Sequence, residues 1–324
     1  MKNSHSSNVK TEFADQTAKR SEANAEAHAD SNIQFGWFEW MLALGMAITW
    51  GSSFLLIDII IRDAPTAFVP FGRSFFGMVA LFFVRGSRHK ISREHLGRLF
   101  VLGLIWMAMP FFLFPLAEKT VASSIAGMMN GALPVVVGVV TALWVRKAPS
   151  VQRAIAVVVG FLGIILIAAP SISEGSSADL KGIIYLTLAL LCYAVGLNIA
   201  RPLQALYSPA TLMLRVVAIS TLLSAPLGIN AMRSTTFSLN MVGATIFLGA
   251  LGSGIAFLLF GTLLKRTGPV RAMIPTYFTP IVGTVLGVLF NDEKILLLSI
   301  VGMLVVILGA WLTSRPEKPV TENN

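Results

Sequence analysis

Apolar residues fill most of the chain from Trp37 onward, in runs of about 20 residues that are separated by short polar stretches. A helix needs about 20 apolar residues to cross the hydrocarbon core of a bilayer. The connections are too short to hold a folded soluble domain, so we expect an all-α membrane protein. The pattern predicts ten transmembrane helices, at 37–58, 66–84, 98–117, 121–144, 152–170, 182–200, 209–229, 241–263, 268–290 and 295–313.

The two ends of the chain differ from the rest. Residues 1–34 are rich in Ser, Asn, Ala and charged residues and have almost no apolar surface to bury. Such a segment cannot offset the entropy lost on ordering, so we expect a disordered tail at 1–34. Residues 314–324 form a second polar tail after the last predicted helix.

Composition narrows the class of protein further. Only 13% of the residues are charged and the mean hydropathy is +0.75, whereas soluble domains carry about 25% charged residues. These values exclude a soluble globular protein. The single cysteine, Cys192, lies in an apolar run and excludes an internal disulfide and a thiolate metal cluster. We expect no metal and no cofactor.

The formal net charge of +9 is explained by its position along the chain. With ten spans, one set of connections together with the C-terminal tail holds thirteen Lys and Arg residues, and the opposite set holds five. Basic residues stay on the cytoplasmic side of a membrane, so both termini are expected in the cytoplasm. The basic excess therefore indicates topology, and we expect no nucleic-acid partner.

The chain also matches itself at an offset of 146 residues, which pairs the third and fourth spans with the eighth and ninth. Two five-helix units follow, at 37–170 and 181–313, and an odd number of spans makes the second unit inverted relative to the first. Inverted repeats are a recurring transporter architecture, with the substrate site where the halves meet. An old duplication without transport is the alternative. The most specific matching pairs are Phe111/Phe257, Phe114/Phe260, Lys119/Lys265 and Pro134/Pro280.

Away from the span ends, three arginines, Arg73, Arg215 and Arg271, are the charged residues predicted inside spans; no Asp, Glu or His is predicted there. A charge in hydrocarbon is costly and usually faces a cavity or the bundle interior. Alternatively, each of the three snorkels to an interface or anchors a carbonyl, and for Arg271 snorkelling is the better interpretation. Because proton-coupled pumps need a titratable group in the membrane, we expect transport down the substrate gradient or by exchange.

Other polar and aromatic residues in the spans are candidates for lining a cavity that accepts amphiphilic organic solutes. Bonding between helices is the alternative for each amide or hydroxyl. These candidates are Trp50, Ser53, Trp106, Asn130, Tyr193, Asn198, Thr276 and Tyr277.

Glycine pairs and prolines predict packing and bending. The pairs Gly127/Gly131 and Gly283/Gly287 have the spacing that lets helices approach closely. Pro134 and Pro280 interrupt helical hydrogen bonding and could act as bends during gating.

At this point the sequence resembles the drug/metabolite transporter superfamily, in the ten-helix group with two EamA-type domains. The residues that carry the resemblance are Trp50-Gly51-Ser52-Ser53-Phe54, Pro70 with Arg73, Pro134 and Pro280. The resemblance implies a ten-helix bundle around a central cavity in a bacterial inner or other plasma membrane. It also implies export of amino acids, their derivatives or other small metabolites, and some relatives import.

One departure from the family pattern is visible. Relatives often have an acidic residue after the fourth and ninth spans. Glu293 fits the second position, but Arg146-Lys147 occupies the first. A symmetric acidic pair is therefore in doubt.

These observations favour a secondary transporter that exports amino acids or related small metabolites by alternating access. Arg73 and Arg215 would attract a substrate carboxylate, while Trp50 and Tyr193 would pack against its apolar part. The alternatives are an exporter of cationic or amphiphilic drugs and a receptor that transports nothing. An enzyme is not expected, because only Cys192 and scattered hydroxyls are present in the spans. The sequence leaves open whether the protein is a monomer or a homodimer.

Overall fold

The computed structural model describes residues 36–146, 150–173 and 177–313, and these residues form helices without any strand. The all-α prediction is confirmed over this part of the chain, whereas both predicted tails lie outside it. Short 3₁₀ turns (η2, Arg93–His95; η4, Met232–Ser234) and two π-helical segments (η3, Gly103–Ala108; η5, Leu248–Ile255) join the α-helices. The α-helices are α2 (Trp37–Asp63), α3 (Phe68–Phe82), α4 (Leu96–Leu102), α5 (Met109–Ala117), α6 (Ser123–Asn130), α7 (Leu133–Val145), α8 (Val151–Ser173), α9 (Ser177–Leu206), α10 (Pro209–Ala231), α11 (Leu239–Phe247), α12 (Ala256–Ala272), α13 (Ile274–Asn291) and α14 (Leu297–Thr313).

The lengths of these helices fit a membrane protein. In the described part of the chain, six helices are long and apolar enough to cross a bilayer, and the bent pair α6–α7 would make seven. Three shorter apolar segments, 68–82, 154–169 and 297–312, fall at the other predicted spans. Each of the ten predicted segments thus coincides with a helix or a run of joined helices, and ten crossings stay a prediction.

Local sequence explains where several helices begin and end. Ser208 and Ser238 accept hydrogen bonds from the backbone N–H groups of Thr211 and Met241, both at 3.2 Å, at the starts of α10 and α11. These are N-caps, which satisfy free donors of the first turn. Helix α2 ends before Ala64, which is extended because the residue before a proline, here Pro65, avoids helical geometry.

The predicted span 121–144 is broken in two. Helices α6 and α7 meet at an angle of 44°, and Pro134 lies in the first turn of α7. Proline has no N–H to continue the helical ladder and its ring crowds the preceding turn. The break leaves Asn130 at the end of a helix rather than in the middle of one.

The turn between the predicted eighth and ninth spans also lies elsewhere than expected. The sequence suggested a turn at residues 265–267, but α12 continues to Ala272 and α13 begins at Ile274. Pro275 lies in the first turn of α13, the part of a helix where proline is tolerated. The position of this proline, rather than the charged residues before it, sets the turn.

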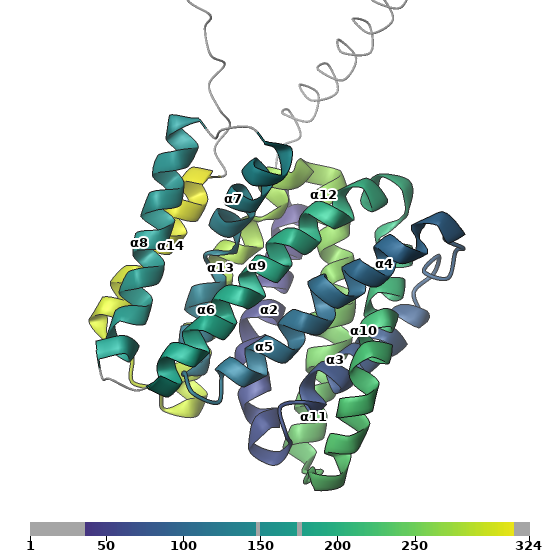
Figure 1. The fold of residues 1–324 in the computed structure, drawn as a ribbon, viewed down its shortest axis with the longest axis horizontal. Helices are drawn as coiled ribbons and strands as arrows, with labels where there is room; N and C mark the ends of the chain where they lie inside the picture. The colour runs from purple at the N-terminus through teal and green to yellow at the C-terminus, as the bar shows by residue number, and fades with distance from the viewer. Residues whose placement is uncertain (1–35, 147–149, 174–176, 314–324) are drawn as a thin grey trace, which may run out of the picture.

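Helices at corresponding positions of the two predicted units lie side by side. Helix α8 packs along α14, and α3 packs against α10, as Figure 1 shows for α8 and α14 at one edge of the bundle. The Ser74 and Ser220 hydroxyls meet at 2.8 Å and are 146 residues apart, the offset of the sequence repeat. Arg146 and Asp292, at the same spacing, are the non-glycine residues with positive φ in the described chain.

Glycines let α8 and α14 approach until their backbones touch. A Cβ added at Gly163 would lie 2.6 Å from the backbone nitrogen of Val306, and one at Gly302 would lie 2.7 Å from that of Ile167. Close backbone approach through small residues is the usual way for helices to associate where no hydrophobic effect drives them together.

Substitution of Gly163 by Ala should therefore lower the thermal stability of the purified protein in detergent, because the two backbones must separate. Overpacking of this kind costs about 1–3 kcal/mol. Gly45→Ala is the matched control, since a Cβ at Gly45 meets nothing within 4 Å. Equal melting temperatures for the two variants would contradict this account of the packing.

Candidate functional site

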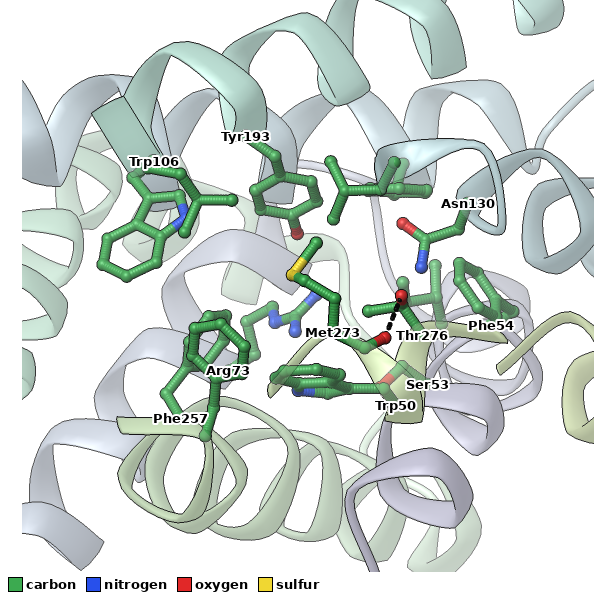
Figure 2. A pocket seen from close by; sticks show the side chains of 15 residues that line it. Trp50, Ser53, Phe54, Arg73, Trp106, Asn130, Tyr193, Phe257, Met273 and Thr276 are labelled. Atoms are coloured by element: carbon green, nitrogen blue, oxygen red, sulfur yellow. Dashed lines mark hydrogen bonds between the residues drawn. The ribbon is translucent and has the colours of Figure 1, made fainter. Parts of the chain in front are cut away.

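A cavity lies between the two halves of the chain, with walls from α2, α3, the run from η3 to α5, α6, α7, α9, α12 and α13. It encloses about 690 Å³ of space, counting the part that is open to solvent. Figure 2 shows the indole of Trp50 on one side and Tyr193 on the other, with the Arg73 guanidinium and Met273 between them. Most of the wall is aromatic or aliphatic, and a few polar groups point inward.

Besides Thr276, six of the residues predicted to bind substrate line this cavity. Trp50 and Ser53 come from α2, Tyr193 from α9, and Trp106 from the π-helical segment η3. The break between α6 and α7 directs the Asn130 amide inward (Figure 2). The sixth is Arg73. The structure brings these six together, and their role in substrate binding stays a prediction.

Arg73 supplies the positive charge in the cavity wall. The residue is 4% exposed, and its Nε donates a hydrogen bond of 2.9 Å to the Ser253 hydroxyl. The guanidinium carbon lies 3.6 Å from the centre of the Phe111 ring, a cation–π contact. No described carboxylate forms an ion pair with Arg73, and an arginine carries five donors in a planar fork. The guanidinium is therefore positioned by its neighbours and can still bind an anion.

The π-helical segment η5 holds both Trp50 and Arg73 in place. The indole N–H of Trp50 donates to the Gly252 carbonyl at 3.3 Å, and Ser253 of the same segment accepts from Arg73. A π-helical turn shifts the backbone ladder and is frequent at functional sites. The other π-helical segment, η3, carries Trp106 into the same cavity.

A second hollow continues from the cavity. It shares Trp106, Phe257 and Phe260 with the first and extends to Gln204 and Pro209. Those two residues lie near the end of α9 and the start of α10. The hollow space therefore reaches from the middle of the bundle toward that end.

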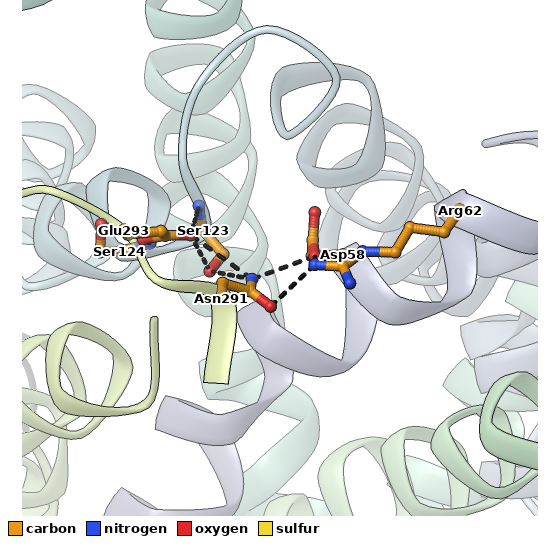
Figure 3. Close-up of polar contacts among 6 residues, drawn as sticks. All are labelled: Asp58, Arg62, Ser123, Ser124, Asn291 and Glu293. Carbon is orange, nitrogen blue, oxygen red and sulfur yellow. Dashed lines mark hydrogen bonds and ion pairs between the residues drawn. The ribbon is translucent and has the colours of Figure 1, made fainter. Parts of the chain in front are cut away.

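A polar cluster lies at the opposite end, and we call it the Glu293 cluster. Asn291 donates to Asp58 at 3.0 Å and accepts from Arg62 at 2.8 Å, and Arg62 also pairs with Asp58. Figure 3 shows how the cluster joins α2, the start of α6, the last residue of α13 and the chain after α13. The cluster consists of Asp58, Arg62, Ser123, Ser124, Asn291 and Glu293.

Glu293 itself caps helix α6. Its Oε1 accepts from the Ser123 N–H at 2.9 Å and from the Ser123 hydroxyl at 2.7 Å, and its Oε2 accepts from the Ser124 N–H at 3.0 Å. A helix N-terminus favours an anion. Burial raises the pKa of Glu293, but these hydrogen bonds outweigh it and hold the pKa below its usual value. The left-handed conformation of Asp292, with φ of 50°, turns the chain here.

The comparisons with known proteins address the whole chain. The model of the EamA-like transporter family matches residues 37–169 and again residues 180–315. The chain belongs to this family. The resemblance found in the sequence is thereby confirmed, and membrane transport of small solutes is the activity of the EamA-like transporters.

Individual proteins similar to this EamA-like chain are also named as transporters or as a WAT1-related protein. An uncharacterized transporter of Archaeoglobus fulgidus is 23% identical over 280 residues, which cover 86% of this chain and 99% of the relative. The uncharacterized transporter YoaV of Bacillus subtilis is 21% identical over 278 residues, which cover 84% of this chain and 94% of the relative. A WAT1-related protein of Arabidopsis thaliana is 26% identical, covering 74% of each chain.

One crystal structure shares the fold of this EamA-like chain, with a TM-score of 0.58 at 14% sequence identity. The match covers 84% of this chain and 94% of the other. At this identity the likeness concerns the fold alone.

The cavity wall of this EamA-like protein follows the sequence repeat. Phe114 and Phe260 are an identical pair at the 146-residue offset, and both line the cavity. Asn130 and Thr276 form another lining pair at this offset. From the sequence the phenylalanine pairs indicated only a duplication, although the pairing of aromatic residues within spans was also a signal for the cavity wall.

Three predicted binding residues lie outside the cavity. Asn198 donates to the Ala194 carbonyl at 2.9 Å, and Tyr277 donates to the Ala310 carbonyl at 3.2 Å. Arg215 contacts the carbonyls of Arg88 and His89 at 3.4 and 3.3 Å, which is the carbonyl-anchoring alternative. The side chain of Arg271, the remaining candidate, lies outside the described residues.

The predicted glycines and prolines of α6 and α13 lie where these helices cross. A Cβ on Gly127 would come 3.4 Å from the Cα of Gly283, and one on Gly131 would come 2.6 Å from Pro280 Cγ. A Cβ on Gly287 would meet Glu293 Oε2 at 2.5 Å. Packing is thus observed at these positions, and gating stays a prediction.

Two acids depart from their expected surroundings. The sequence placed Glu118 in a loop, but it is 6% exposed, and Glu39 is 5% exposed. Glu39 accepts a hydrogen bond of 2.7 Å from Arg266 Nε. The absence of acids from the interior of the predicted spans therefore did not mean that no carboxylate is buried, and the argument against proton coupling loses its premise. Hydropathy alone could not reveal the burial of Glu39 and Glu118, because each lies at the end of a helix, where neighbouring helices decide exposure.

Replacing Ser253 by Ala should destabilise the protein through Arg73, because hydrogen bonds to charged groups contribute about 1.5–3 kcal/mol. The measurement is the melting temperature in detergent. Ser299→Ala is the matched control, since Ser299 is also buried but bonds the Ile167 carbonyl. In an Arg73→Met background the effect of Ser253→Ala should disappear; an unchanged effect would show that Ser253 acts independently of Arg73.

Proposed function

We propose that this protein is a secondary transporter that moves small organic solutes with a carboxylate, such as amino acids, outward across the plasma membrane by alternating access. The observation that carries the proposal is the buried Arg73 guanidinium in an aromatic cavity between the two halves. It has no ion-pair partner among the described residues, so a substrate carboxylate could bind it in the bidentate geometry that arginine favours.

The rest of the wall fits the remainder of such a solute. Trp50 lies 5.4 Å from Phe257 and 5.7 Å from Phe260, ring centre to ring centre. These rings offer an apolar surface, while the Asn130 amide and the Ser53 and Thr276 hydroxyls offer polar contacts. No carboxylate lines the cavity in the described part of the chain. This absence favours an anionic or zwitterionic solute over a cationic drug.

Alternating access is supported by the difference between the two ends. The Glu293 cluster joins both halves at one end, and the second hollow extends toward the other. In this proposal ten helices form two inverted five-helix repeats. The solute crosses the membrane when the end with the Glu293 cluster opens and the other end closes. The Ser74–Ser220 contact and the matching conformations of Arg146 and Asp292 support that symmetry.

The direct test is counterflow in proteoliposomes loaded with one solute and exposed to the same solute in labelled form. The panel contains amino acids, nucleobases and cationic dyes. We expect counterflow of at least one carboxylate solute. Binding without counterflow of any solute would identify a receptor, and counterflow of dyes alone would identify a drug exporter; either result would overturn the proposal.

Substitution of Arg73 by Gln should raise the half-saturating concentration of carboxylate solutes at least tenfold, which corresponds to about 1.4 kcal/mol, and spare neutral solutes. Arg73→Lys keeps the charge and should restore part of the affinity. Arg215→Gln is the control, because Arg215 does not line the cavity. If Arg73→Gln affects carboxylate and neutral solutes equally, the role of Arg73 is structural.

A further inference from the structure

A buried acid without a hydrogen-bond partner lies near the Glu293 cluster. Glu118 directly follows α5, and its N–H donates to the Phe114 carbonyl at 2.9 Å. The residue is 6% exposed, and neither carboxyl oxygen has a partner among the described residues. An ionised carboxylate in such a place is far more costly than a neutral acid.

Two acids and one buried cation act electrostatically on Glu118. Asp58 on α2 and Glu293 after α13 act on it electrostatically, and Arg73 on α3 is the opposing cation. Lys119, next to it in the chain, and Lys181 at the start of α9 are exposed to solvent. Burial, followed by the charges of Asp58 and Glu293, raises the pKa of Glu118 well above its usual value.

Glu118 and Glu293 are two acids at one end of the bundle in opposite environments. Glu293 receives hydrogen bonds from a helix N-terminus and two serines, so it stays charged. Glu118 receives none from the described residues, so it binds the proton. Two neighbouring acids with such different proton affinities can take different roles. Here Glu118 holds the proton and Glu293 stays a charged carboxylate.

We propose that Glu118 is a proton-binding site whose occupancy holds the Glu293 cluster closed. The proposal deepens the alternating access proposed above and rests on it. When the cluster is closed, Asp58 and Glu293 face Glu118, and the three acids can share this space when one of them is neutral. When α2, α6 and α13 separate, water reaches Glu118, the like charges move away and the carboxyl releases its proton to solvent.

The position of Glu118 also connects it with the cavity. Phe114, four residues earlier on α5, lines the cavity, and Arg73 is both the charge in the cavity wall and the cation that opposes Glu118. A solute carboxylate on Arg73 neutralises that cation and therefore increases the proton affinity of Glu118. Closure of the cluster and occupation of the cavity thus both favour the protonated acid.

A proton fits this site better than a metal ion. In the part of the chain that the structure describes, no group of three His, Cys, Asp or Glu side chains could hold a metal. A sodium ion needs several oxygen ligands, and Glu293 already uses both carboxylate oxygens on α6. A proton needs the Glu118 carboxyl alone.

The test measures the cluster itself and needs no known solute. Spin labels are attached at Ala122→Cys, next to Ser123, and at Leu296→Cys, three residues after Glu293, in a Cys192→Ala chain reconstituted in liposomes; both positions are exposed. Closed-state proton affinity exceeds open-state affinity, so closure is favoured at low pH and lost as pH rises through the closed-state pKa. Between the open-state and the closed-state pKa of Glu118, the ratio of the open to the closed population, read from the label distances, should rise up to about tenfold per pH unit.

Glu118→Gln is neutral at every pH and nearly isosteric with the protonated acid. Its distribution of label distances should therefore be independent of pH from pH 5 to pH 9, and should match the mainly closed distribution of the unsubstituted chain at low pH. Glu94→Gln removes an exposed acid and should leave the titration unchanged. A distance that does not change with pH in the unsubstituted chain, or a titration that survives Glu118→Gln, would overturn the proposal. A shift that follows sodium at constant pH and is lost in Glu118→Gln would overturn it in favour of a cation.

Flux measurements separate this inference from the proposed function. With a solute that shows counterflow, an imposed pH gradient should drive accumulation in the unsubstituted protein. In Glu118→Gln counterflow should persist while gradient-driven accumulation is lost at least tenfold. If the labels titrate as expected but no solute is moved, the proposed function fails and the proton site stands. Gradient-driven accumulation that persists in Glu118→Gln would show that Glu118 carries no coupling proton.

Discussion

The burial of one guanidinium in the middle of an apolar bundle constrains the rest of this structure. Arg73 requires compensation where water is scarce, and it receives a hydroxyl from Ser253 and the face of Phe111. The hydroxyl comes from a π-helical segment, which also supplies the carbonyl that fixes Trp50. These contacts position Arg73 but leave its charge unbalanced by any described carboxylate, and the proposed substrate site follows from that imbalance.

The two parts of the chain that match the family model, residues 37–169 and 180–315, differ in charge at corresponding turns. Arg146 and Asp292 occupy equivalent left-handed turns, yet the residue after the first is Lys147 and the residue after the second is Glu293. Glu293 caps a helix N-terminus, which a lysine could not do because both are positive. In the proposed transport cycle, this difference stabilises closure at the end that holds the Glu293 cluster.

Several features of the site could be predicted from the sequence, and others could not. Trp50, Arg73 and Asn130 were recognised because polar or amphipathic groups within an apolar run need a reason to be there. Arg215 satisfied the same criterion but binds backbone carbonyls of a loop. Glu118 failed the criterion because it follows its helix, although it is buried. In both cases exposure depends on segments remote in the sequence.

Hydrophobic length, the all-helical class and the internal duplication were all evident in the amino-acid sequence, because each depends on composition and spacing within one stretch of chain. The break at Gly131, the π-helical segments, the place of the Arg73 guanidinium in the cavity wall and the burial of Glu118 emerged only in three dimensions. Each of these depends on helices that meet across the bundle, as Arg73 and Ser253 do over 180 residues of sequence. Packing between distant segments decides which polar groups lose water, and no local pattern encodes that loss.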